Sequence, residues 1–135
     1  MKRADILKKA GHPSLYFAAG RGNMAAVRAL VEAEADVEKA TELGNTAALC
    51  AAQGGHLSIL VYLVEECGAS LRRSATNGAT IMHRAASHGQ LDMVRYVAKN
   101  APELIDVLTN NNGTPIMVAS VEGMTPVVRH LARLG

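Results

Sequence analysis

The sequence is poor in aromatic residues, in cysteine and in net charge. It has no Trp, and its aromatic residues are three Tyr and one Phe among 135 residues. Its hydrophobic content of 49% must therefore build a core from aliphatic side chains. The two cysteines, Cys50 and Cys67, are too few for a disulfide framework and belong to no Cys-X-X-Cys pair. We interpret both as reduced thiols.

Charge and hydrophobic runs narrow the class of protein further. A net charge of +2 on a surface of mixed sign gives no strong field toward nucleic acid or an anionic membrane. No apolar run reaches the length of a membrane span, and the first 14 residues lack the apolar centre of a secretory signal. We expect a soluble intracellular protein without membrane insertion, in the cytoplasm or nucleus, with the cytoplasm preferred.

The sequence does contain a repeat, which covers almost its whole length. One template recurs at residues 11–31, 44–64, 77–97 and 112–132. An alanine falls at positions 18, 51, 85 and 119, and a glycine falls at positions 22, 55, 89 and 123. Successive steps are 33, 34 and 34 residues. A period of this length is typical of solenoids, whose units stack because none can bury its apolar face alone.

Each unit predicts two helices followed by a loop. Thr46, Thr80 and Thr114 precede alanine-rich segments, where a hydroxyl can cap a helix, and Pro115 fits a first helical position. In the third unit we predict helices over residues 80–87 and 91–99, separated by a left-handed turn at Gly89. Paired alanines would let successive first helices lie close together. The polar stretches between units, at residues 41–45, 74–78 and 109–113, predict tight reversals.

The repeated residues resemble the ankyrin repeat. The third unit carries the pattern most fully, in Gly78, Thr80, Met82, His83, Ala85, Ala86 and Gly89. The resemblance covers residues 11–135 and implies an all-α ankyrin-repeat solenoid of stacked helix-turn-helix units joined by β-hairpin-like loops. We divide the chain into an N-terminal extension or capping helix at 1–10, repeats at 11–43, 44–77 and 78–111, and a truncated repeat at 112–135. Because the last unit stops before the family's next loop, we expect a longer parent protein.

The sequence departs from the ankyrin pattern at several positions. The histidine of the family's first-helix motif is present only as His83, and the corresponding positions hold Tyr16, Leu49 and Met117. Glu34 stands where the second helix of the family normally ends on glycine.

Two histidines of the third unit, His83 and His88, raise the question of an active site. A catalytic histidine needs an orienting carboxylate and a reacting partner, which the repeat pattern does not specify. The resemblance implies that His83 ties loops together by hydrogen bonds, and we give His56 a similar structural role. The spacing of His83 and His88 fits no zinc motif, and the stretch at 18–22 lacks the ending of a phosphate-binding loop. We expect no catalytic residue, metal ion or cofactor.

The resemblance implies a non-catalytic module that binds a protein or peptide through a concave face and loop tips, without a small-molecule substrate. We expect partner contacts at positions that stacking does not need. These are His12, Arg21, Glu42, Leu43, Asn45, Gln53, Thr76, Asn77, Ala79, Arg84, Ser87, His88, Asn110, Asn111 and Glu122. Arg84, a long cation, and Leu43, an apolar residue at a loop tip, are the preferred hot spots.

Three functional interpretations remain open. The first is an interaction module, monomeric as a fragment, within a scaffold, signalling or effector protein. The second is a regulatory or substrate-recruiting domain of an enzyme whose catalytic domain lies outside these residues. The third and least favoured is nucleic-acid binding through basic residues, for which the candidates are Arg72, Arg73, Arg129, His130 and Arg133.

Overall fold

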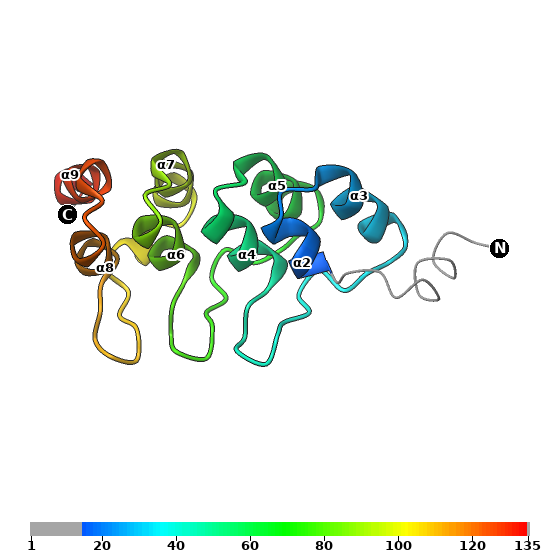
Figure 1. The fold of residues 1–135 in the computed structure, drawn as a ribbon, viewed down its shortest axis with the longest axis horizontal. Helices are drawn as coiled ribbons and strands as arrows, with labels where there is room; N and C mark the ends of the chain where they lie inside the picture. The colour runs from blue at the N-terminus through cyan, green and yellow to red at the C-terminus, as the bar shows by residue number, and fades with distance from the viewer. Residues whose placement is uncertain (1–14, 135) are drawn as a thin grey trace.

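The computed structural model describes residues 15–134 as two stacked layers of helices. The inner layer contains α2 (Leu15–Gly20), α4 (Ala47–Gly54), α6 (Ile81–Ser87) and α8 (Pro115–Val121). The outer layer contains α3 (Met24–Glu32), α5 (Leu57–Val61), η1 (Tyr62–Glu66), α7 (Leu91–Asn100), η2 (Pro102–Asp106) and α9 (Thr125–Leu134). Figure 1 shows one row of inner helices, a second row of outer helices, and loops that project from the inner row. The expected all-α solenoid is confirmed, and the expected extension at 1–10 lies outside the described residues.

Small residues set the spacing of the inner layer. Ala19, Ala52 and Ala86 are completely buried where α2, α4, α6 and α8 contact one another in sequence order. A larger side chain at any of these positions would overpack the contact between neighbouring helices. The alanine pairs therefore place each inner helix flush against the next, as the sequence predicts.

The helix caps follow the threonine pattern. The side-chain oxygens of Thr46, Thr80 and Thr114 each accept a hydrogen bond from the backbone amide three residues later, at 3.3, 3.4 and 3.3 Å. Each bond satisfies one of the amides that the first turn of a helix leaves without a partner. Pro115 occupies the first position of α8. The predicted starts of the inner helices are confirmed within one residue.

One outer helix contains an extra residue. Gly22 and Gly55 are 33 residues apart, whereas the step from Gly55 to Gly89 is 34 residues. In the first unit, the bond that closes the outer helix runs from the Ala35 amide to the Leu30 carbonyl, five residues back. In the second unit, the equivalent bond runs from the Ala69 amide to the Leu63 carbonyl and spans one residue more. The π-helical turn η1 takes up this additional residue. The repeat spacing shows that one residue is added, and the structure places the added residue in η1.

Three loops repeat the same turn at residues 41–45, 75–79 and 109–113. In each, the amide of the first residue donates to the carbonyl of the fifth, and the amide of the fourth donates to the carbonyl of the first. The fourth positions, Gly44, Gly78 and Asn112, have φ of 82°, 83° and 63°. We call these segments the hairpin loops. No strand is assigned within residues 15–134, so the loops are hairpin-like turns.

Successive hairpin loops are bonded to one another. The Thr76 amide donates to the Leu43 carbonyl at 2.9 Å, and the Asn110 amide donates to the Asn77 carbonyl at 2.9 Å. Since the same positions pair in both cases, the loops project in register, side by side. The stack thus presents a row of loop tips that adjoins the inner helices (Figure 1).

Candidate binding surface

The exposed sides of the inner helices and the tips of the hairpin loops form one surface, which we call the inner face. One helix position recurs just before the first alanine of each unit, and it holds Phe17, Cys50, Arg84 and Val118. Phe17 is exposed, whereas the other three side chains are half-buried. Phe17 is 51% exposed, and the Arg21 guanidinium lies 5.6 Å from the centre of its ring. Arg21 was among the contact residues predicted from the sequence and Phe17 was not, although its shared register with Arg84 could have identified it.

Arg84 lies at the centre of the inner face and brings three expected contact residues together. Its Nη1 donates to Gln53 Oε1 at 2.9 Å, and its Nη2 donates to Asn45 Oδ1 at 2.7 Å. Both acceptors belong to the preceding unit, so Arg84 links two repeats as well as facing the groove. Its Nε is buried and has no hydrogen-bond partner among residues 15–134. Arg84 also forms no ion pair with a carboxylate of these residues.

The charge of Arg84 acts on its neighbours. Burial raises the pKa of the Cys50 thiol, and the nearby Arg84 guanidinium partly opposes that increase. Burial also lowers the pKa of His83, and the positive charge of Arg84 lowers it further, against the carbonyls of Gly113 and Val107. The guanidinium therefore adds positive potential at Cys50 and His83, although burial has the larger effect on both.

A shallow groove of about 390 Å³ opens beside α6, between the second and third hairpin loops. We call it the polar groove, and it is lined by Asn77, Ala79, His83, Arg84, Ser87, His88, Thr109, Asn111, Gly113 and Val118. His88 is exposed, and its Nδ1 lies 3.0 Å from Ser87 Oγ and from the Arg84 carbonyl oxygen. Most of the expected contact residues of the third unit meet here.

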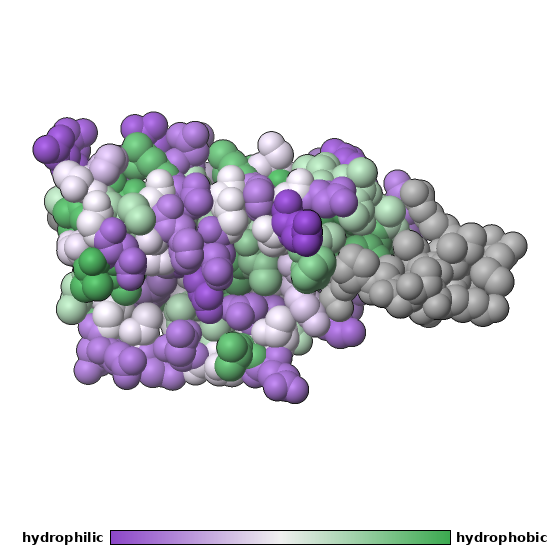
Figure 2. All heavy atoms as spheres, in the orientation of Figure 1, coloured by the Kyte–Doolittle hydropathy of each residue, from purple (hydrophilic) through white to green (hydrophobic). Residues whose placement is uncertain are grey.

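An apolar patch adjoins the polar groove. A hollow of about 220 Å³ is lined by Gly113, Met117, Val118, Val121 and Glu122, and it shares Gly113 and Val118 with the polar groove. Met117 is 52% exposed and Val121 is 84% exposed. Figure 2 shows apolar surface over α8 within a largely hydrophilic surround. Of these residues, only Glu122 was predicted from the sequence to contact a partner.

The loop tips add one apolar side chain and a line of polar contacts. Leu43 is 66% exposed beside the exposed Glu42, and its carbonyl accepts a bond from Thr76 Oγ1 at 3.0 Å. Asn110 Nδ2 donates to the Thr76 carbonyl at 2.8 Å. These polar side chains hold the tips together, whereas the Leu43 side chain extends outward.

One expected contact residue is buried, which corrects that prediction, and another is partly occupied by a neighbouring side chain. Ala79 is buried, with 7% of its surface exposed, because its carbonyl closes the second hairpin loop onto the Ala75 amide. Although Ala79 lines the polar groove, it therefore offers a partner little surface. Asn45 is half-buried and is occupied by Arg84. His12 lies outside the described residues.

The buried histidine of the third unit has a structural role, as expected. His83 Nδ1 accepts a bond from the Thr80 amide at 3.1 Å, so its Nε2 donates to the Gly113 carbonyl at 2.9 Å. His56 Nε2 lies 3.1 Å from the Gly20 carbonyl oxygen. Each histidine ties its unit to a neighbouring one through a backbone carbonyl. This geometry confirms the hydrogen-bonding interpretation of His83.

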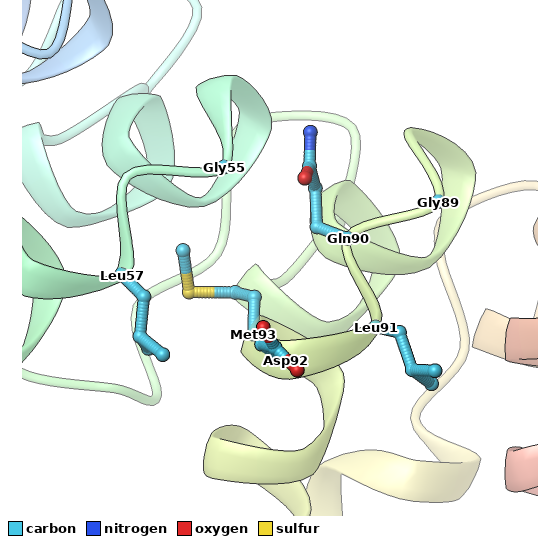
Figure 3. Close-up of a pocket in the computed structure, with 7 residues that line it drawn as sticks. All are labelled: Gly55, Leu57, Gly89, Gln90, Leu91, Asp92 and Met93. Carbon is cyan, nitrogen blue, oxygen red and sulfur yellow. The ribbon is translucent and has the colours of Figure 1, made fainter.

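A further pocket, of about 280 Å³, lies where the turn of the second unit meets α7. Figure 3 shows the Gln90 side chain directed toward the turn at Gly55, and the Met93 side chain directed toward Leu57. A Cβ on Gly55 would collide with the Gln90 amide group, and one on Gly22 would collide with the His56 ring. The pocket therefore lies at a contact that recurs along the stack, between the turn glycine of one unit and a side chain of the next.

The basic residues of the nucleic-acid interpretation are partly neutralised. Arg72 forms an ion pair with Glu103, and Arg73 pairs with Glu38 at 3.4 Å. Within residues 15–134, no group of three or more His, Cys, Asp or Glu side chains could hold a metal ion. No helix in this range has the length and apolar character needed to cross a membrane.

Comparison with known families agrees with the repeat. A family model described as ankyrin repeats in many copies matches residues 15–64. A second, described as ankyrin repeats in three copies, matches residues 67–135. No curated protein matches the chain. Together the two matches include all of the described helices except the last two residues of η1.

Proposed function

This chain belongs to the ankyrin repeat family, and we propose that it binds a partner protein or peptide through its inner face. Ankyrin repeats are protein–protein interaction modules and are typically non-catalytic. We place the module inside the cell, within a longer scaffold, signalling or effector protein. The observation that carries the proposal is the composition of the inner face, where side chains that stacking does not use remain exposed.

Three exposed residues show this most clearly. Leu43 projects from a loop tip, His88 stands at the rim of the polar groove, and Val121 lies on the apolar patch. All three lie outside the buried contacts between helices. A shallow, extended surface of this kind suits a folded surface or peptide, because the polar groove and the hollow beside α8 are both open to solvent.

Affinity capture with variants of the whole chain tests the proposal. We would immobilise the wild type, His88→Ala and Leu43→Asp, and compare the proteins each retains from a cell extract. We expect a specific partner to be retained by the wild type and lost from at least one variant. Lys99→Ala, on the exposed side of α7, is the matched outer-layer control and should retain that partner.

Folding must be checked in parallel by far-UV circular dichroism, because a misfolded variant would lose every partner. If both inner-face variants keep all partners while Lys99→Ala loses one, the binding face is the outer layer. That result would contradict the proposal.

A further inference from the structure

We infer that the inner face receives an extended acidic segment of a partner protein, in which two carboxylates bind Arg21 and Arg84. The two arginines belong to the first and third units, where Arg21 follows α2 directly and Arg84 lies on α6. This inference rests on the proposed function and specifies the charge and the spacing of the residues that the partner presents.

The first step concerns the distribution of charge between the two layers. The segments that contain the first three inner helices and the turns after them have no Asp or Glu, over residues 15–31, 44–64 and 77–91. Acidic side chains lie instead on the outer elements, at Glu32, Glu65, Glu66, Asp92 and Glu103. Glu42 is the one carboxylate that the three hairpin loops contribute. The inner helices of these units therefore present positive charge, which favours an acidic partner.

The second step concerns Arg84, which has N–H groups left for a ligand. Its Nη1 and Nη2 each donate one bond to an amide oxygen, of Gln53 and Asn45, and each keeps one further N–H. Its Nε is buried without a hydrogen-bond partner among residues 15–134, so the charge is partly removed from water. No carboxylate of these residues pairs with it. A ligand carboxylate would therefore meet an oriented cation whose attraction is stronger than that of a fully solvated one.

The third step concerns Arg21, which is also held in place without a counter-ion. Its guanidinium lies 5.6 Å from the centre of the Phe17 ring, and no carboxylate among residues 15–134 pairs with it. Arg21 precedes the turn glycine of its unit, as His88 does in the third unit. His88 is exposed although a unit lies on either side of it. Stacking therefore leaves this position open to a partner.

The repeat sets the distance between the two arginines. Phe17, which orients Arg21, shares a register position with Arg84, and Cys50 of α4 lies between them. Packed helices lie about 8–10 Å apart, so the two steps from α2 to α6 span about 16–20 Å. An extended chain advances about 3.3 Å per residue and directs alternate side chains to opposite faces. Two acids six residues apart share one face and are separated by about 20 Å, so they can reach both arginines.

This arrangement favours an acidic peptide over nucleic acid. Strong binding to nucleic acid comes from many phosphate contacts along a regular backbone. The described inner helices and their turns offer two unpaired arginines, with the uncharged α4 between them. Two separate cations suit a ligand that carries charge at two points rather than along its whole length.

The probe for the test is a phage-displayed library of random linear peptides, selected on the whole immobilised chain. Selection should enrich two Asp or Glu residues six positions apart, and anisotropy of the enriched sequence as a fluorescent synthetic peptide gives its affinity. Replacing the acid that binds Arg84 by the matching amide should weaken binding about tenfold, as expected for a charged hydrogen bond. At the acid that binds the exposed Arg21, the loss should be about two- to fivefold. Removing one residue between the acids should weaken binding too, because the two then face opposite sides.

Double-mutant cycles between chain and peptide separate pairing from structure. In Arg84→Gln, replacing one acid of the peptide should no longer matter, while replacing the other should still weaken binding. Arg21→Gln should reverse the two results, and its exposed position should spare the fold, which circular dichroism checks. Arg95→Gln, at an exposed position of α7, is the matched control and should change neither. If Arg84→Gln and Arg21→Gln weaken every peptide equally, the arginines act through structure and the inference is wrong.

The outcomes also separate this inference from the proposed function. Amide chemical-shift changes locate a selected peptide on the chain. A peptide that binds the inner face without a preference for acids overturns the inference and leaves the proposed function standing, and a peptide that binds only the outer helices contradicts both. A single-stranded oligonucleotide that binds the inner face more tightly than the selected peptide overturns the inference. Failure to select any peptide does so too, whereas affinity capture still decides the proposed function.

Discussion

Substitution of Gly78 tests the contact between hairpin loops. Gly78 has φ of 83°, and a Cβ built on it would lie 2.9 Å from the Asn110 backbone nitrogen and 3.1 Å from Thr109 Cα. Because both are backbone atoms, the third hairpin loop must move as a unit to make room. The change Gly78→Ala therefore combines a conformational cost with a steric one.

The magnitude follows from these two contributions. Holding an alanine in the left-handed region costs about 1 kcal/mol. Moving the third hairpin loop weakens the bond between the Asn110 amide and the Asn77 carbonyl, which contributes about 1 kcal/mol. Repositioning the loop adds strain of a similar size. We expect Gly78→Ala to lower the free energy of unfolding by about 2 to 3 kcal/mol.

Gly68 provides the matched control. Its φ is 74°, but nothing lies within 4 Å of a Cβ at this position. Gly68→Ala should lower the free energy of unfolding by about 1 kcal/mol, from conformation alone. Both substitutions restrict the unfolded chain equally, so that effect cancels in the comparison. Urea unfolding followed by circular dichroism gives both values, and equal destabilisation of the two variants would refute the close approach of the loops.

Two further predictions concern single residues. Glu34 has φ of 64° at the end of the first outer helix, so Glu34→Gly should raise the free energy of unfolding by about 0.5 to 1 kcal/mol. Asn112→Gly should change the free energy of unfolding less, because asparagine tolerates a positive φ. A loss of stability in Glu34→Gly would contradict the assignment of backbone strain to Glu34. Burial lowers the pKa of His83, so the folded state favours the neutral ring. Stability should be full above the unfolded value near 6.5 and should decrease as the pH falls below it. Between about pH 7.5 and about pH 5 this decrease should be smaller in His83→Gln, and an unchanged slope would exclude His83 as its source.

Local sequence signals predicted the scaffold well. Thr80 caps its helix and Ala86 is buried because both act through short-range backbone geometry and side-chain size, which are the same in every repeat. His83 reaches Gly113 because the repeat places the next loop at a fixed distance. These residues depend on the template alone.

The candidate binding surface was less predictable. The contacts of Arg84 with Asn45 and Gln53 depend on the rotamer of a long side chain and on the preceding unit, which a repeat pattern does not contain. Met117 occupies the position equivalent to His83, which bonds the following unit, and Val121 occupies the position equivalent to Ser87. Only the packed structure shows that they are exposed. Their apolar surface was missed for this reason.

The π-helical turn η1 shows that the two layers tolerate changes of length differently. An added residue in the outer helix widens one turn there, while the alanines of α4 and α6 keep their contact. Insertions can therefore accumulate on the outer side without altering the order of side chains that a partner would encounter. In the second unit the outer layer thus accommodates a change of length, while the spacing of the neighbouring inner helices is kept.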